Sequence, residues 1–159
     1  RMRYLAAEAS AVLAREKLDT SNAIRLTLPL HERMRAKTRA LEEAVVAYQK
    51  TSGYGVSSFS TEAGYQIAHI YGRLVKDLME SARPPGLSEL EMAQYEILLE
   101  EQAFPFEDNA ISIHEQNASR TQNGIYDEWV KRSFEALKQL LPGRYDKPEI
   151  LTGVVDELG

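Results

Sequence analysis

The sequence contains no cysteine, which excludes disulfide bonds, thiolate nucleophiles and cysteine-based zinc or iron–sulfur sites. Histidine is scarce as well, with three residues in a chain of 159. No apolar run approaches the roughly 20 residues that a membrane-spanning helix needs, so we expect no direct membrane insertion. The chain begins at Arg1 with neither a methionine nor an export signal, which predicts that it is part of a longer protein.

Positive charge is missing from residues 84–119, which contain no Lys or Arg. The same stretch carries eight carboxylates: Glu89, Glu91, Glu96, Glu100, Glu101, Glu107, Asp108 and Glu115. Apolar residues recur there at helical spacing, which predicts an ordered acidic helix. A helix surface that carries charge of one sign is either neutralised by a basic neighbour within the fold or presented to a partner. We hypothesise that Arg33, Lys37 or Arg39 approaches it from a basic segment upstream.

Length and composition predict a single domain over residues 1–159 with a substantial core. The hydrophobic content of 43% and the charged content of 27% are typical of a globular protein. The net charge of -5 argues against a nucleic-acid partner, because affinity for phosphates depends on clustered Lys and Arg.

Apolar periodicity and turn residues predict an all-α fold of about five to six antiparallel helices. The expected helices are residues 3–17 and 30–50, a segment capped by Ser60 or Thr61 and ended by Pro84, residues 88–123, residues 126–141, and a short helix within 146–159. Residues 24–28 alternate with a period of two. Pro29 follows them directly, which favours an extended or helical lead-in over a strand.

Three local signals are especially informative. Ser88 and Glu91 have the spacing of a capping box, which predicts a helix start. Asn123-Gly124 is typical of a helix C-terminus. No turn residues surround Pro105, so we expect one long helix that is kinked at this proline.

The apolar stripes also predict which faces are buried. Leu5, Val12 and Leu13 are expected on the inner face of the first helix. Trp129 lies on the cleanest stripe of the chain and is predicted in the core. His69 falls on an apolar helix face and is predicted to be a core histidine.

Metal and nucleophile motifs fail on spacing. A di-iron carboxylate bundle places a Glu three residues before a His. The residues at that position here are Leu28, Gln66 and Ile111. We therefore predict no metal, no cofactor and no catalytic residue.

The best candidates for a functional site are carboxylates and aromatic residues of the acidic helix, which we predict to contact another protein with a basic surface. They are Glu96, Glu100, Glu101, Phe104, Phe106, Glu107 and Asp108. Two alternatives stay open: the carboxylates could pair as a general acid and base, and the two phenylalanines could pack at the proline kink.

Two groups of segments carry a resemblance. Residues 62–71 alternate small and aromatic side chains and look like the first helix of a tetratricopeptide repeat (TPR). Residues 95–107, 125–130 and 141–145 are similar to the C-terminal region of large TPR proteins of the Gram-negative bacterial envelope. The similarity extends over about residues 30–149.

This resemblance implies a non-enzymatic scaffold at the end of a TPR-type array, periplasmic or envelope-associated, beside transport or motility machinery. The cytoplasm is not excluded. The resemblance also implies an N-terminal helix over residues 1–22 that continues from preceding repeats, a terminal module over 23–145 and a short C-terminal helix over 146–159. The alternatives are a carboxylate-based enzyme in a helix bundle and a purely structural capping module.

Overall fold

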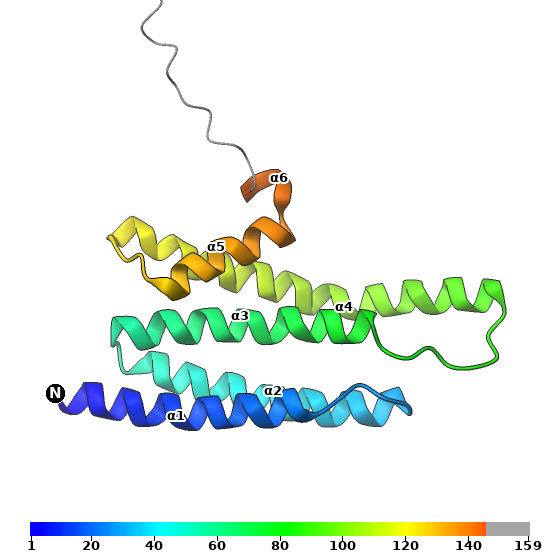
Figure 1. The fold of residues 1–159 in the computed structure, drawn as a ribbon, viewed down its shortest axis with the longest axis horizontal. Helices are drawn as coiled ribbons and strands as arrows, with labels where there is room; N and C mark the ends of the chain where they lie inside the picture. Colours follow the sequence, from blue (N-terminus) through cyan, green and yellow to red (C-terminus); the bar gives the residue numbers. More distant parts are fainter. Residues whose placement is uncertain (146–159) are drawn as a thin grey trace, which may run out of the picture.

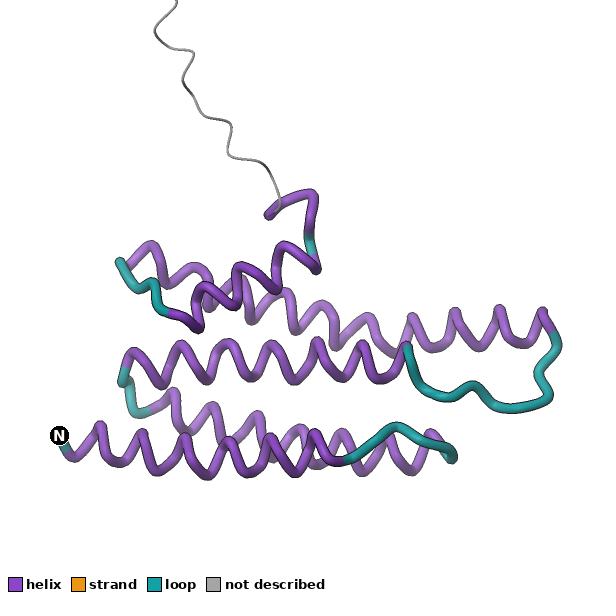
Figure 2. Tube along the Cα trace, viewed as in Figure 1, coloured by secondary structure: helices purple, strands orange, loops and turns teal. Residues whose placement is uncertain are grey.

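The computed structural model describes residues 1–145 and shows an all-helical protein, as the sequence predicts (Figure 1). The helices are α1 (Met2–Ala23), α2 (Leu30–Gly53), α3 (Ser57–Met79), α4 (Glu89–Ala118), the 3-10 helix η1 (Ser119–Asn123), α5 (Glu128–Leu140) and the single turn α6 (Pro142–Tyr145). No strand occurs in this part of the chain, where residues 24–29 are a loop (Figure 2). The helix predicted within 146–159 lies outside the described residues.

Each of the helices α2 to α4 runs antiparallel to the one before it. α5 packs across α3 and α4 on the side away from α1 and α2 (Figure 1). The closest packing is between α3 and α4 and between α1 and α2. α3 is the central helix, because it contacts α1, α2, α4 and α5. The main core lies around it and includes Leu41, Tyr48, Leu74 and Leu99.

Small residues bury the inner face of α1. Ala7, Ala11 and Ala14 are fully buried, whereas Leu5 and Val12 on the same helix are exposed. The prediction for this face was therefore wrong. Alanine lets two helices approach closely, and the periodicity of the larger residues marked the outer face instead. α1 also continues beyond the predicted end at residue 17 and ends at Ala23.

The α3–α4 contact depends on a glycine. A Cβ placed on Gly64 would lie 2.5 Å from Oδ1 of Asn117 in α4, closer than real Cβ contacts come. Asn117 is itself buried, and its amide donates to the backbone carbonyl of Thr61 at 3.2 Å. A polar side chain of α4 therefore occupies the space that any other residue at position 64 would need.

Helix ends confirm two of the predicted signals. Ser88 and Glu91 form the complete capping box at the start of α4. Gly124 follows η1 with a left-handed φ of 76°, a conformation that glycine adopts without steric cost. The predicted cap of α3 was wrong: this helix begins at Ser57, and the Thr61 hydroxyl donates to Asp127 at 2.5 Å instead.

Two aromatic predictions also need correction. His69 lies on the exposed side of α3, not in the core, and its ring stacks on Tyr65. Trp129 is half-buried at the edge of α5, where it contacts Tyr65 and lies under the guanidinium of Arg132 at 4.8 Å. The fully buried residues of α5 are Val130, Ser133 and Leu137. The apolar stripe of α5 therefore does include buried residues, but Trp129 lies at its edge and not in the core.

We predict that Gly64→Ala lowers the free energy of unfolding by about 1–3 kcal/mol, because the new methyl group overlaps Asn117. Gly72→Ala is the matched control on the same helix, since its Cβ would meet nothing nearer than 3.9 Å. That change should leave stability equal or raise it by up to about 1 kcal/mol through helix propensity. Urea denaturation followed by circular dichroism measures both, and equal effects would contradict the proposed close approach.

A second prediction concerns Tyr48, whose hydroxyl is the one fully buried side-chain polar atom without a hydrogen bond in residues 1–145. Burial raises the pKa of this phenol well above its usual value, with nearby Glu62 adding to the shift. Because an unsatisfied buried hydroxyl is costly, Tyr48→Phe should raise the free energy of unfolding by roughly 1 kcal/mol. A clear loss of stability in the same denaturation assay would show that the hydroxyl has a stabilising partner.

Candidate functional site

α4 has an inner face that packs on the core. Leu99, Ala103 and Ala110 are buried along it. Phe106 belongs to the same face, is partly buried, and stacks on Tyr71 of α3 with ring centroids 6.3 Å apart. α4 is continuous through Pro105, as the sequence predicted. Of the two predicted aromatic candidates, Phe106 is therefore a packing residue.

The opposite face of α4 exposes large apolar side chains. Leu90, Ile97 and Phe104 are spaced by seven residues, so they form a line along one side of the helix. Their exposed fractions are 69%, 54% and 66%. The first turns of α4 also reach beyond the ends of the other helices (Figure 1). We call the line of Leu90, Ile97 and Phe104 the outer stripe.

Carboxylates border the outer stripe on both sides. Glu100, Glu101 and Asp108 are exposed, and Glu107 is half-buried. Residues 84–119 contain no Lys or Arg that could neutralise them from within α4. The candidates Glu100, Glu101, Phe104, Glu107 and Asp108 thus belong to the same outward side of one helix, where apolar and acidic side chains lie next to each other.

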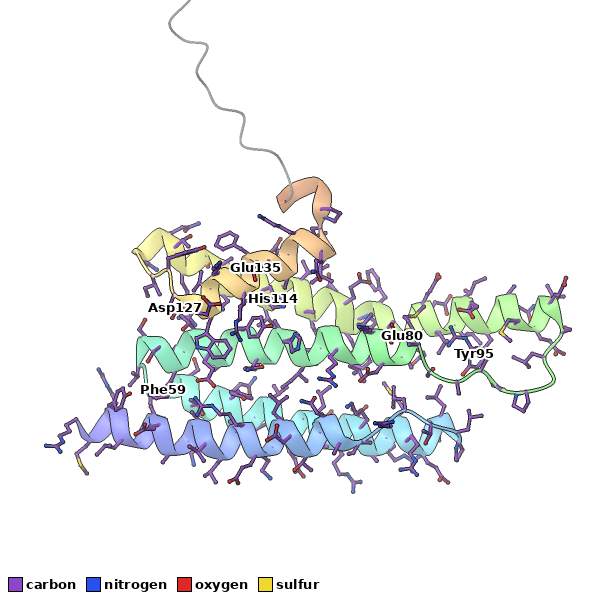
Figure 3. The ribbon with its side chains drawn as sticks, viewed as in Figure 1. Phe59, Glu80, Tyr95, His114, Asp127 and Glu135 are labelled. Carbon is purple, nitrogen blue, oxygen red and sulfur yellow. The ribbon has the colours of Figure 1, made fainter. Side chains whose placement is uncertain are left out.

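Glu96 has a different role from the other candidates. Arg83 donates to it through Nε at 2.8 Å and Nη2 at 3.0 Å, and this hydrogen-bonded pairing lowers the pKa of the Glu96 carboxyl. Arg83 also donates to the backbone carbonyls of Met79 and Ser81. Its guanidinium lies 6.0 Å from the centre of the Tyr95 ring, in the first half of α4 (Figure 3). Glu96 and Arg83 therefore hold the α3–α4 connection against α4.

The basic residues of α2 do not neutralise the acidic helix, contrary to our hypothesis. The buried Lys37 donates to the carbonyl of Ser21 at 2.7 Å and lies 3.8 Å from the carboxylate of Asp77 in α3. Desolvation lowers its pKa, and Asp77 opposes that shift. Within residues 1–145, Arg33 and Arg39 form no ion pair. α2 packs mainly on α1 and α3, which keeps its charges away from the outer stripe.

An apolar groove lies beside α4 on the side away from the outer stripe. It has a volume of about 510 Å³, and its walls come from the start of α2, the α3–α4 connection and α4. The main lining residues are Leu28, Leu30, Met34, Pro84, Tyr95 and Leu99. The groove adds apolar surface near the protruding end of α4 and brings no charged side chain with it.

The sequence did not indicate Leu90 as a surface residue, and its apolar pattern predicted Ile97 on the inner face of α4, which was wrong. Their seven-residue spacing with Phe104 was visible, but helical periodicity alone does not distinguish a buried stripe from an exposed one. α4 has apolar residues on two opposite faces, and only the packing of α3 shows which face is covered.

No protein-family model, curated protein or solved structure matches the chain. In the described residues, no helix has both the length and the apolar character needed to cross a membrane. The same residues contain no group of three or more metal-binding side chains that could hold an ion.

We predict opposite outcomes for the two phenylalanines that flank Pro105. Phe106→Ala should lower the free energy of unfolding by roughly 2–3 kcal/mol, because a half-buried ring that packs on Tyr71 is lost. Phe104→Ala should change it by less than about 0.5 kcal/mol, since that ring is mostly exposed. Urea titrations of both variants test the assignment. A similar loss in both would mean that the outer stripe is buried in solution.

Proposed function

We propose that this protein is a non-enzymatic helical scaffold, the terminal module of a TPR-type array, which binds a basic amphipathic helix of another protein. The observation that carries the proposal is the outer stripe with its acidic borders. Exposed apolar side chains in a continuous line are typical of interaction surfaces. Here the line runs along the side of α4 that faces away from the core.

Charge complementarity defines the partner. A helix that lies along the outer stripe needs apolar residues at the same seven-residue spacing. On either side of that line it meets Glu100 and Glu101, and further along it meets Asp108. Lys or Arg in the flanking positions would compensate these carboxylates, steer the approach and disfavour acidic competitors.

The outward face of α1 supports the array. Met2, Leu5, Val12 and Leu13 are all exposed, between 46% and 82%. In stacked helical repeats each unit covers the apolar face of its neighbour. In this proposal a preceding helix of the array covers α1, as the resemblance to TPR proteins implies, and α4 remains available to the partner.

The carboxylates favour a scaffold over the enzyme alternative. A general acid needs a carboxyl whose pKa is raised, typically by burial. The pKa of Glu96 is instead lowered by Arg83. Glu100, Glu101 and Asp108 are exposed, unlike the buried carboxyl that a general acid needs. Charge and exposure at these positions suit recognition of a basic surface.

The decisive test replaces Glu100, Glu101, Glu107 and Asp108 with Gln or Asn. The partner is first captured from cells that make the protein and then purified for binding kinetics. We expect the variant to associate at least roughly tenfold more slowly at low salt, with a flatter dependence on ionic strength. Helicity and melting temperature should stay close to those of the unmodified protein, because the side chains are largely exposed.

The matched control removes the same number of negative charges elsewhere. Glu8, Glu16, Glu32 and Glu42 are exposed residues of α1 and α2, and their replacement with Gln should leave the association rate nearly unchanged. Equal loss in both variants would show that only net charge matters. Unchanged binding in the first variant would place recognition away from α4. Either result contradicts the proposal.

A further inference from the structure

A polar cluster around His114 lies where α5 crosses α3 and α4 (Figure 3). His114 of α4 is its principal residue, with only 2% of its surface exposed. Burial lowers the pKa of His114 to about 4, with a further contribution from the charge of His69. The imidazole is therefore neutral near pH 7.

A chain of hydrogen bonds fixes the orientation of this imidazole. Arg120 Nε donates to Oδ1 of Asn117 at 3.1 Å, and Nδ2 of Asn117 donates to the Ser133 hydroxyl at 2.9 Å. The Ser133 oxygen lies 3.1 Å from Nδ1 of His114. Asn117 and Ser133 are both buried, so these bonds are protected from water. Buried groups that are fully satisfied hold one geometry.

The same chain determines which ring nitrogen carries the proton. The Ser133 oxygen accepts from Asn117, so its own hydrogen is free to be donated. In residues 1–145, Nδ1 of His114 is the one acceptor that this hydroxyl reaches. Donation from the hydroxyl to Nδ1 gives the buried Ser133 hydrogen an acceptor that the other tautomer would deny it, which favours the tautomer with the proton on Nε2.

Nε2 of His114 faces a cavity. This nitrogen has no hydrogen bond to the described residues. Among these residues the Tyr48 hydroxyl is the one fully buried side-chain polar atom without a partner, so Nε2 cannot be fully buried as well. Nε2 must therefore touch accessible space. His114 lines a cavity of about 580 Å³ between α3 and α5, which is where this N–H donor is available.

Two cations line the same cavity. Arg73 and Lys76 follow His69 at helical spacing on α3, and Gln139 of α5 lies opposite. Among residues 1–145, Arg73 and Lys76 form no ion pair. The acidic lining residues are Asp77, which already faces Lys37, and Glu80. The cavity thus combines an oriented N–H donor with two cations that form no ion pair and with two carboxylates, of which Asp77 lies near Lys37.

We propose that this cavity binds a small oxyanion, the phosphate or carboxylate group of a small molecule. Arg73 and Lys76 supply the charge, and Nε2–H of His114 supplies a directed hydrogen bond to one oxygen. Gly72, Ala136 and Leu140 provide an apolar wall for the rest of the molecule. The volume is in the range of about 300–1,000 Å³ that small-molecule sites occupy. The site is independent of the proposed contact with a partner protein.

Histidine side-chain NMR tests the site directly. The unmodified protein is titrated with inorganic phosphate and, separately, with acetate, at constant ionic strength in a chloride background. We expect saturable shifts of the His114 and His69 ring nitrogens in at least one titration, and the effective anion identifies the head group. The Nε2–H tautomer of His114 should be visible before any addition. His31, at the start of α2, should not shift.

The variant Arg73→Gln/Lys76→Gln should weaken the apparent affinity at least tenfold. The control Arg33→Gln/Lys50→Gln removes the same charge from exposed positions of α2 and should bind like the unmodified protein. Shifts that rise linearly without saturation for both anions would overturn the proposal. Saturation that is unchanged in the Arg73/Lys76 variant would overturn it as well, because the charges would then lie elsewhere. These surface changes spare the buried hydrogen bonds, so the fold is retained.

Discussion

The close approach of α3 and α4 at Gly64 and Asn117 determines most of what this molecule presents to its surroundings. The glycine leaves room for one polar side chain of the neighbouring helix, and that side chain bonds to the backbone of α3. A helix pair held at this distance has little freedom to rotate, because rotation of α4 would drive Asn117 into α3. Together with the packing of Leu99 and Ala103 in the core, this contact fixes which side of α4 faces outward.

The consequences are different at the two ends of α4. Near its C-terminus, Asn117 also bonds to Ser133, which connects α5 and orients His114 toward the cavity. Near its N-terminus, Leu99 and Ala103 face the core, so Leu90 and Ile97 must face outward. One helix therefore carries both the apolar, acidic surface and the histidine of the cavity, and a single contact sets the geometry of each.

Local chemistry made part of the fold predictable. The capping box of Ser88 and Glu91 and the left-handed Gly124 act over a few residues, so the sequence alone indicates them. The absence of turn residues around Pro105 indicated that a helix continues through it, and α4 does so. All of these signals concern where a helix begins, continues or ends. They say nothing about which helix covers which face.

Tertiary packing decided the rest. Ala7, Ala11 and Ala14 form the buried face of α1, whereas Leu5 and Val12 lie on its exposed face, because small residues allow close approach of the neighbouring helix. Trp129 and His69 were predicted in the core, but the buried residues next to them are Val130, Ser133 and Ala68. The sequence predicted the candidate surface on α4 through its carboxylates and Phe104. It could not predict the outer stripe, because the exposure of that stripe depends on α3 covering the opposite face of α4.

Some charges pair between helices, as Arg15 does with Glu62 and Lys37 with Asp77, but the exposed carboxylates Glu100, Glu101 and Asp108 of α4 form no ion pair with the basic residues of α2 within residues 1–145. The basic residues of α2 and α3 face α1, the cavity and solvent, while the carboxylates of α4 face away from them. Exposed ion pairs contribute at most about 1 kcal/mol each, so folding loses little by leaving these groups apart. In the two proposals, charges of opposite sign serve two distinct surfaces, the one on α4 for a cationic helix and the cavity for an oxyanion. Because the two sites lie on different sides of α4, each of them can be occupied without covering the other.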